Sequence, residues 1–412
     1  MPDVSPDTLT DGTAIETPDF QGYAPTPRRP ILLIGDDLAW LAGQKELAGR
    51  RVILADPQAD ALALLAAEPL DGVVASYTDV TTSIALLHTA REVCPGVPGL
   101  LRANGKELAG GWIPFPVLPR MDSVEVLDDH VRTQLLAAKW RTKPAFGSLM
   151  KKITQVPTQP ALYTQISEAL QSPDASIEKI AELVSHEPAV TAKLLQLVNS
   201  PLLALRGRVT SVRDATSLLG LSRLRSLVLA TCLFRQFDAT KCRGFSMTRF
   251  EATSLKIASW SAAIAKGESR DKQVADMAFT ASLLHNFGML LLAANLPDAY
   301  DQVLRRAKEQ RVSIAWAEME ILGATHAEVA GAMLASWGIP FPIVNAVGWY
   351  PLPSASEDTE FSPLTAVHAA AAVDTYEQTG MLSYDQDYMR KLGLAEKLEC
   401  WCMTLPGETL AA

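Results

Sequence analysis

Short apolar runs alternate with helix-like segments over the first third of the chain. ILLIGDD, RVILAD, DGVVASY and PGLLRA each have the pattern of a buried strand, and PFPVLP that of a further short one. Between them, ADALALLAAEP and TTSIALLHTAREV carry apolar residues at helical spacing. Alternating strand and helix signals are typical of a parallel sheet covered on both faces. The pattern therefore predicts a doubly wound α/β domain over residues 29–140.

The remainder of the chain shows helical periodicity and no convincing strand pattern. Apolar residues mark one helical face over 177–184 and another over 188–198. Ser176 is a candidate N-cap of the first helix, and Pro188 suits the first turn of the second. We therefore predict an all-helical bundle over residues 149–372.

Three further segments complete the expected organisation. Residues 1–28 are rich in Pro, Thr and Asp without apolar periodicity, which predicts a disordered tail. Turn residues and basic charge over 141–148 indicate a linker, and residues 373–412 are expected to form a helical extension. The fold class expected is thus α/β followed by all-α.

Charge and cysteine content narrow the class of protein. The formal net charge of −9 argues against a surface that wraps nucleic acid. An odd count of 5 cysteines without a CxxC motif fits reduced cytosolic thiols better than a disulfide framework. The first thirty residues lack the apolar region of a secretory signal.

One stretch, residues 278–296, approaches membrane-spanning length. His285, Asn286 and Asn295 within it would be costly in lipid, which favours a buried core helix. We therefore expect a cytoplasmic protein without membrane insertion.

The N-terminal segment resembles a response-regulator receiver domain, which has a flavodoxin-like fold. The resemblance rests on ILLIGDD, DGVVASY and VLPRMDSVEVL in this order. It implies that Asp36 and Asp37 stand for the acidic pair that binds Mg²⁺, and that Ser76 occupies the phosphoacceptor position. A serine does not replace a carboxylate in that chemistry, so we expect remnants of an acidic pocket and no phosphoacceptor. Asp79 is an alternative acceptor, disfavoured because it lies past the strand end.

Two further receiver positions are altered. Arg120 stands near the position of the family's lysine, and Arg102 and Ala103 stand where a Thr or Ser is expected. Arginine keeps the charge of lysine without its compact ammonium group. A degenerate receiver-like domain that serves for contact is therefore expected.

Four stretches of the helical segment, in order and spacing, resemble the HDOD domain, a signalling relative of the HD-domain metal phosphohydrolases. They are SPDASIEKIAELVSHEPAVTAKLLQLVNS, SVRDATSLLGLSRLRSLVLA, ASLLHNFGMLLLA and LGATHAEVAGAMLASWGIP. The resemblance implies an HD-like bundle in a bacterial signal-transduction setting, with links to two-component systems and cyclic di-GMP. It also implies that the metal-binding pair of the HD enzymes corresponds to His285 and Asn286, where a neutral amide replaces the carboxylate.

By the same resemblance, this sequence also departs from the family at most of the other metal-ligand positions. An upstream ligand falls on Thr253, and His326 matches a family histidine. Tyr350 stands where histidines are found, and His368 is kept while Ala371 replaces an acid. The remaining imidazoles are too few for a catalytic Zn²⁺ or a binuclear centre.

Substitute carboxylates are the alternative to a lost metal site. Glu251, Asp276, Glu320 and Glu328 are the candidates, although each suits a solvated helix surface equally well. We expect His285 and Asn286 to be buried polar groups satisfied by hydrogen bonds within the bundle. No metal and no other cofactor is expected.

A helix-turn-helix is a competing interpretation of residues 211–230. Arg223 and Arg225 would lie on the recognition helix. Packing of the leucines inward would leave only these two arginines for DNA, which favours a helical hairpin inside the bundle.

The sequence thus predicts a non-catalytic signalling protein that acts through protein contacts. The alternatives are an HD-type phosphohydrolase with substitute ligands and a DNA-binding regulator. Expected partners are other signalling proteins, and a homo-oligomer is left open. Trp349, Tyr350 and Trp401 are candidate interface residues, with core packing as the alternative.

Overall fold

The computed structural model describes most of the 412 residues. The described residues are 28–36, 38–41, 43–55, 58–67, 69–103, 115–118, 123–172, 174–203 and 208–411. They fall into two compact units, one drawn from 24–147 with 332–344 and the other from 148–331 with 345–412. All but Arg28 of the predicted tail lies outside the described residues.

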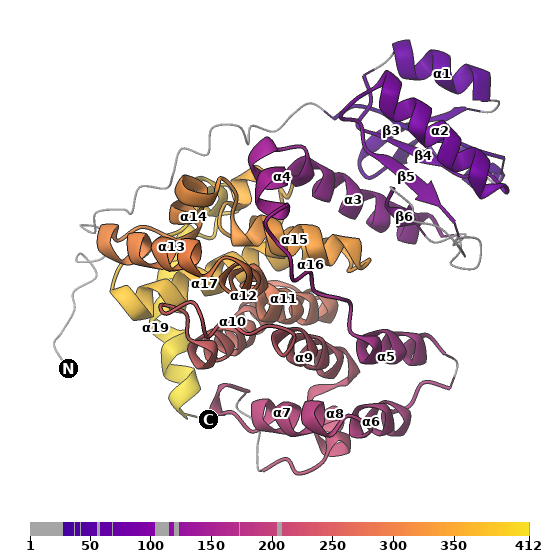
Figure 1. Cartoon of the computed structure of the whole chain (residues 1–412). Helices are drawn as coiled ribbons and strands as arrows, with labels where there is room; N and C mark the ends of the chain where they lie inside the picture. The colour runs from indigo at the N-terminus through magenta and orange to yellow at the C-terminus, as the bar shows by residue number, and fades with distance from the viewer. Residues whose placement is uncertain are drawn as a thin grey trace. The chain divides into compact units, whose positions relative to one another are not determined.

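The N-terminal unit contains a six-stranded sheet with helices on both faces (Figure 1). Its strands are β1 (Ile31–Ile34), β2 (Glu46–Leu47), β3 (Arg50–Ala55), β4 (Gly72–Ala75), β5 (Gly99–Arg102) and β6 (Val117–Leu118). Their order is β2-β3-β1-β4-β5-β6, with β2 antiparallel to β3 and all other pairs parallel. The helices that lie wholly within this unit are α1 (Gln58–Ala67), α2 (Val80–Val93) and α3 (Val124–Arg141).

The alternation of side chains along β1 explains the layers. Leu32 and Ile34 belong to a buried cluster with residues of α1 and α2, whereas Ile31 and Leu33 pack with residues of α3. Successive residues of a strand point to opposite faces, so a strand that is apolar throughout needs a cover on each side. Helices on both faces provide it.

The strands and helices predicted for this region agree with the structure, which has three elements that were not predicted, among them helix α3. The pair β2–β3 begins with a two-residue strand that has no periodicity to reveal it. In addition, helix α4 (Pro144–Met150) occupies most of the segment predicted to be a linker.

The rest of the described chain is helical. Its α-helices are α5 (Ala161–Gln171), α6 (Ile177–Ser185), α7 (Pro188–Val198), α8 (Val212–Leu219), α9 (Leu221–Phe234), α10 (Met247–Glu268), α11 (Lys272–Leu284), α12 (Phe287–Asn295), α13 (Pro297–Gln310), α14 (Ile314–Leu322), α15 (His326–Ser336), α16 (Phe341–Trp349), α17 (Pro363–Thr379), α18 (Gln386–Lys391) and α19 (Ala395–Ala411). Short 3₁₀ turns occur at Ala39–Leu41, Pro201–Leu203 and Pro353–Ala355. Helix α17 continues across the predicted boundary at 372, so the extension begins inside a helix.

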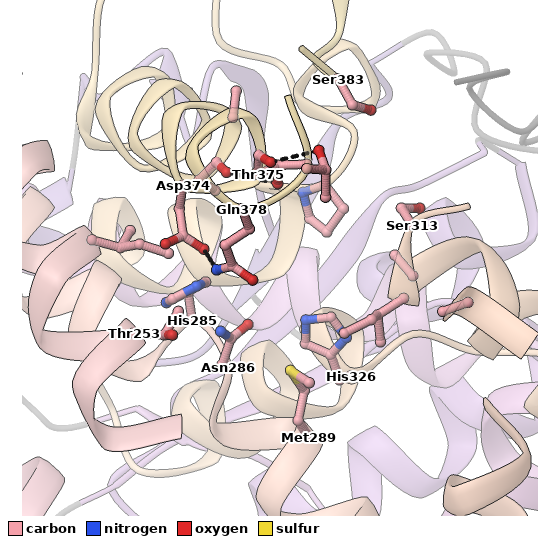
Figure 2. Close-up of a pocket in the computed structure, with 18 of the residues that line it drawn as sticks. Thr253, His285, Asn286, Met289, Ser313, His326, Asp374, Thr375, Gln378 and Ser383 are labelled. Atoms are coloured by element: carbon pink, nitrogen blue, oxygen red, sulfur yellow. Dashed lines mark hydrogen bonds between the residues drawn. The ribbon is translucent and has the colours of Figure 1, made fainter. Parts of the chain in front are cut away.

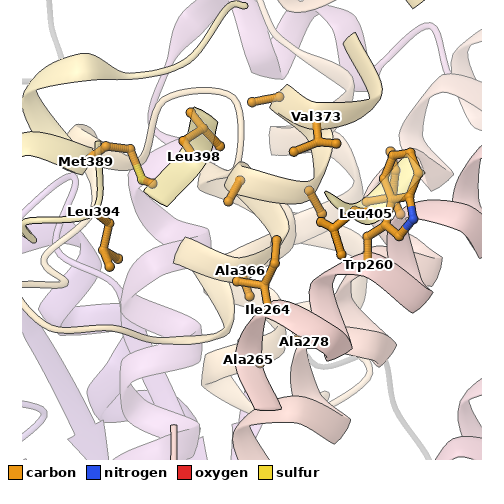
Figure 3. Close-up of a cluster of buried hydrophobic side chains, with 14 of the residues drawn as sticks. Trp260, Ile264, Ala265, Ala278, Ala366, Val373, Met389, Leu394, Leu398 and Leu405 are labelled. Atoms are coloured by element: carbon orange, nitrogen blue, oxygen red, sulfur yellow. The ribbon is translucent and has the colours of Figure 1, made fainter. Parts of the chain in front are cut away.

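A buried cluster of α10, α11, α17, α18 and α19 is the core that fixes the C-terminal helices (Figure 3). Helix α17 contributes mostly small side chains, including Ala366, Ala369 and Ala370, each fully buried. Small residues let helix backbones approach closely, and the larger Trp260 and Ile264 of α10 fill the remaining space. This packing places α10 and α17 side by side at the site described below.

The most apolar helical segment is interrupted by the His–Asn pair. Helix α11 ends at Leu284, and α12 begins at Phe287 with Asn286 as its N-cap. Residues Lys272–Asn295 are long and apolar enough to cross a membrane by composition, but 78% of their most apolar window is buried inside the protein. The segment therefore has the burial of a core helix pair.

Candidate functional site

A cavity of about 560 Å³ lies in the helical unit, beside the junction of α11 and α12. Its walls come from α10, α12, α13, α14, α15 and α17 and from the segment after α16. His285, Asn286 and His326 lie on the wall, as Figure 2 shows. The structure thus brings the adjacent His285 and Asn286 together with the distant His326, as expected for residues of one site.

His285 is buried at the end of α11. Its Nδ1 atom donates a hydrogen bond to the Ser282 carbonyl, and its ring meets the edge of the Tyr350 ring at 4.9 Å between centroids. Burial lowers the pKa of His285 to about 3, so the ring is neutral near neutral pH. With a proton on Nδ1, the Nε2 atom carries the lone pair.

Gly288 holds α12 against the start of α15. A Cβ atom at this position would lie 2.0 Å from the His326 carbonyl oxygen, closer than atoms can approach. Only glycine permits this contact of backbones. The close approach fixes Asn286 and His326 on neighbouring walls of the cavity.

His326 is the first residue of α15, and both of its ring nitrogens form hydrogen bonds. Its Nδ1 lies 2.6 Å from Glu318 Oε2, and its backbone N–H donates to the same oxygen at 2.8 Å. Its Nε2 lies 2.6 Å from the Tyr350 hydroxyl, which donates to Asn286 Oδ1 at 3.0 Å. A hydrogen-bonded chain, Glu318–His326–Tyr350–Asn286, therefore crosses the site.

The charge of Glu318 influences this chain. Its side chain is fully buried and also accepts a hydrogen bond from the Tyr300 hydroxyl at 2.8 Å. Burial and the negative charge of Glu318 raise the pKa of Tyr350 well above its usual value. The Tyr350 hydroxyl is therefore a neutral donor across the whole physiological pH range.

His368 has a structural role at the cavity wall. Its Nδ1 donates to the Tyr350 carbonyl at 2.7 Å, and its Nε2 accepts from the backbone N–H of Asp385 at 2.9 Å. Burial lowers the pKa of His368, which agrees with a neutral ring. Both ring nitrogens are used to join α17 to neighbouring segments.

Two carboxylates near the cavity escaped the sequence analysis. One is Glu318, and the other is Asp374, which lies one turn after Ala371 on α17 and lines the cavity. Asp374 forms an ion pair with Lys256 at 2.6 Å and accepts from Gln378 Nε2 at 2.6 Å. Neither carboxylate was among the substitutes named from the sequence. The available signal for Glu318 was its place between apolar residues as the first of two glutamates in AWAEMEIL.

The substitute carboxylates proposed from sequence lie elsewhere and have other partners. Glu251, Asp276 and Glu320 form ion pairs with Lys193, Arg223 and Arg306, respectively. Glu328 is buried and accepts from the backbone N–H of Thr325 at 2.8 Å. None of the four lines the cavity.

The donor set as arranged does not fit a metal ion. Both ring nitrogens of His326 and of His368 take part in hydrogen bonds, as does Nδ1 of His285. Thr253 and Ala371, at two positions that the resemblance matches to ligands, line the cavity and supply no charge. In the described part of the chain, no three His, Cys, Asp or Glu side chains are grouped so that they could hold an ion.

The residues matched by resemblance to a receiver pocket belong to the N-terminal unit. Ser76 follows β4, is fully buried, and accepts a hydrogen bond from Arg102 Nη1 at 3.3 Å. Asp36 Oδ1 accepts from the backbone N–H of Thr78 at 2.7 Å. Asp37 and Arg120 lie outside the described residues.

Asp79, the alternative acceptor, caps a helix. It is the N-cap of α2, and its carboxylate accepts from the backbone and hydroxyl groups of Thr81 and Thr82. These hydrogen bonds lower the pKa of Asp79 to about 2. A carboxylate already saturated by donors is a poor nucleophile.

The aromatic interface candidates differ in exposure. Trp349 is 5% exposed, and Tyr350 belongs to the hydrogen-bonded chain inside the cavity. Trp401 is half-buried against the cluster around α17. As placed, Trp349 and Tyr350 serve the interior of the helical unit rather than its surface.

The helix-turn-helix candidate is the hairpin of α8 and α9, which turns at Gly220 with φ of 81°. Arg223 pairs with Asp276 and lies over the ring of Phe279 at 5.3 Å. Arg225 lies over the ring of Tyr163 at 5.9 Å. Both arginines are thus engaged within the helical unit.

Comparisons with known proteins show what the helical unit is similar to. Residues 156–352 match the family model described as the HDOD domain. An HDOD domain protein of Geobacter sulfurreducens is 21% identical with a TM-score of 0.52, over 68% of this chain and 97% of that one. A solved protein of Marinobacter aquaeolei VT8, to which signal transduction is ascribed, is 19% identical with a TM-score of 0.52, over 81% of this chain and 82% of that one.

A curated relative is an uncharacterized protein of Treponema pallidum. It is 24% identical over 247 residues, which are 60% of this chain and 47% of that protein. The chain therefore spans about half the length of this relative. The solved structures show a shared fold.

Proposed function

We propose, from the premise that residues 156–352 form an HDOD domain, that the chain is a signal-transduction regulator without catalysis of its own. It acts through contacts with other signalling proteins in the bacterial cytoplasm. One observation carries this proposal. At the former metal pair the neutral Asn286 replaces the acid, and its Oδ1 atom is bound to the Tyr350 hydroxyl that also meets His326.

The physical argument concerns what a metal-dependent hydrolase requires. A catalytic ion needs several deprotonated ligands with free lone pairs and an open position for water. Here both ring nitrogens of His326 and of His368 are already engaged by protein groups. These hydrogen bonds join helices of the bundle around the cavity.

We extend the proposal to the N-terminal unit as a receiver-like domain without a phosphoacceptor. The parallel strands β3-β1-β4-β5-β6 follow the order 2-1-3-4-5 known from flavodoxin-like sheets. A cation, Arg102, donates to Ser76 where that family carries its reactive aspartate. The unit would therefore serve as a contact module linked to two-component signalling.

Metal content tests the proposal. The full chain is purified without chelator, dialysed against equimolar Zn²⁺, Mn²⁺ and Fe²⁺, and analysed by mass spectrometry of the elements. We expect well under one equivalent of any transition metal, and the same trace level in a His285→Gln variant. A stoichiometric metal that the variant loses would overturn the proposal.

Glu318 and Asp374 support one alternative function, that of a metal-dependent phosphohydrolase. An HD-type phosphohydrolase could use carboxylates from outside the inherited motif, and both groups lie at the site. Glu318 touches His326 on the ring nitrogen turned away from Tyr350, which suits an orienting partner better than a ligand. Metal that is bound by the wild type and lost on Asp374→Asn would favour this alternative.

A further inference from the structure

The mouth of the cavity is cationic. Arg249 of α10 and Lys308 and Arg311 at the end of α13 all line it, and all three side chains are exposed. Arg249 donates to the neutral amide of Gln378. Within the described chain, the side chains of Lys308 and Arg311 have no hydrogen-bond or ion-pair partner.

Little negative charge opposes these cations. Asp374 is the one acidic residue among those that line the cavity, and it is paired with Lys256, which also pairs with Glu377. The three cations at the mouth therefore outnumber the carboxylate that lines the cavity. Such a cleft attracts anions.

The backbone adds to this preference. Helix α14 begins at Ile314, and its N-cap Ser313 and first residues line the cavity. The N-terminus of a helix presents free N–H groups and positive potential, which suit phosphate. Arg311, just before it, adopts a left-handed conformation with φ of 56°, which is costly for a residue with a side chain.

The interior of the cavity is suited to an organic group. Met289, Ile257 and Leu304 give it apolar surface. His285 is 1% exposed, and its Nε2 atom has no hydrogen-bond partner among the described residues although the residue lines the cavity. The Nε2 atom of this neutral ring can accept a hydrogen bond from a hydroxyl or amino group of a ligand.

We propose that this cavity binds a small organic phosphate and does not cleave it. The phosphate lies at the mouth, between Arg249, Lys308, Arg311 and the N-terminus of α14, and the organic part fills the interior beside His285. The volume of about 560 Å³ lies within the range of roughly 300–1,000 Å³ common for small-molecule sites. This inference rests on the proposed function, because it makes the former catalytic cavity the input site of a regulator.

Calorimetric titration of the full chain in chelator tests the inference. The probes are inorganic phosphate, nucleoside monophosphates and sugar phosphates, each ester paired with its neutral parent nucleoside or sugar. We expect at least one ester to bind while its parent does not. Arg311→Gln and Lys308→Gln should each weaken binding about tenfold, since each removes a charge-assisted contact.

Arg306→Gln is the matched control, because Arg306 lies on the same helix and pairs with Glu320 outside the cavity. Its affinity should equal that of the wild type. Absence of binding by every ester, equal binding of the parents, or equal loss in the control would each overturn the inference.

Mass spectrometry of the recovered ester separates the two proposals. An ester that is bound and recovered intact supports both. An ester that is bound and then cleaved when Mn²⁺ is added would overturn the non-catalytic function and leave the site itself standing.

Discussion

Asn286 is, at the scale of one residue, a half-buried neutral acceptor at the cavity wall. Its amide oxygen accepts from the Tyr350 hydroxyl and brings no charge to the site. The neighbouring His285 is neutral because burial disfavours its charged form. Both residues are therefore compatible with a core that holds no ion.

Tyr350→Phe tests the hydrogen-bonded chain. Removal of the hydroxyl leaves His326 Nε2 and Asn286 Oδ1 without their shared partner, which should lower the free energy of unfolding by about 1–3 kcal/mol. Urea unfolding measures the change. Tyr376→Phe is the control, because Tyr376 packs only partly buried against the helical core, and a change there below about 0.5 kcal/mol is expected. Equal effects in the two variants would contradict the role of the chain.

The pKa of His285 predicts a dependence of stability on pH. The folded pKa of about 3 lies below the ordinary value of 6.5, so the unfolded state binds the proton more readily. The free energy of unfolding should therefore fall as pH decreases below about 6.5, by about 2 kcal/mol between pH 7 and pH 5 from this residue.

Urea titrations at the two pH values measure this difference. His285→Gln should shrink it, whereas His186→Gln, at an exposed position, should leave it unchanged. A difference that His285→Gln does not reduce would show that burial of this ring is not its source.

The candidate site could be predicted from sequence only in part. The resemblance to the HDOD domain placed His285, Asn286 and His326 at one site, and the structure brings them to one cavity. Glu318 and Asp374 were missed because a glutamate or aspartate on a helix is ordinarily a surface residue. The sequence around each carboxylate does not reveal its partner, because His326 and Lys256 lie on other helices.

At the scale of elements, the approach of α12 to α15 depends on Gly288. Gly288→Ala would force the new Cβ into the His326 carbonyl, 2.0 Å away, so one of the helices must move. We expect a loss of about 1–3 kcal/mol in the free energy of unfolding, as for other overpacked sites.

Gly267→Ala is the matched control near the end of α10, where a Cβ meets no atom within 4 Å. It should be neutral or stabilise by roughly 0.5–1 kcal/mol, because alanine favours the helix. Equal destabilisation by both alanines would refute the close contact.

Strong periodicity made the longer strands and several helices predictable. Strands β1 and β4 are apolar throughout and stand out, whereas β2 has only two residues at an edge. Helix α4 lies in the segment predicted as a linker, where its proline suits a first turn. Short elements rely on tertiary contacts, which a pattern along the chain does not contain.

At the scale of the whole molecule, the proposed function assigns both units to protein contact rather than to chemistry. For the N-terminal unit, incubation with acetyl phosphate and Mg²⁺ should leave the mass of the protein unchanged. The buried Ser76 next to Arg102 offers no carboxylate to phosphorylate. Mass spectrometry that located a phosphoryl group on Asp36 or Asp79 would restore a phosphorylation switch.

Hydrolysis of bis(p-nitrophenyl) phosphate tests the central claim most directly. The full chain is supplied with Mn²⁺, and the release of p-nitrophenolate is followed by absorbance beside a His326→Gln variant. The account predicts release at the rate of buffer with Mn²⁺ alone for both proteins. Faster release by the wild type, abolished in the variant, would contradict it.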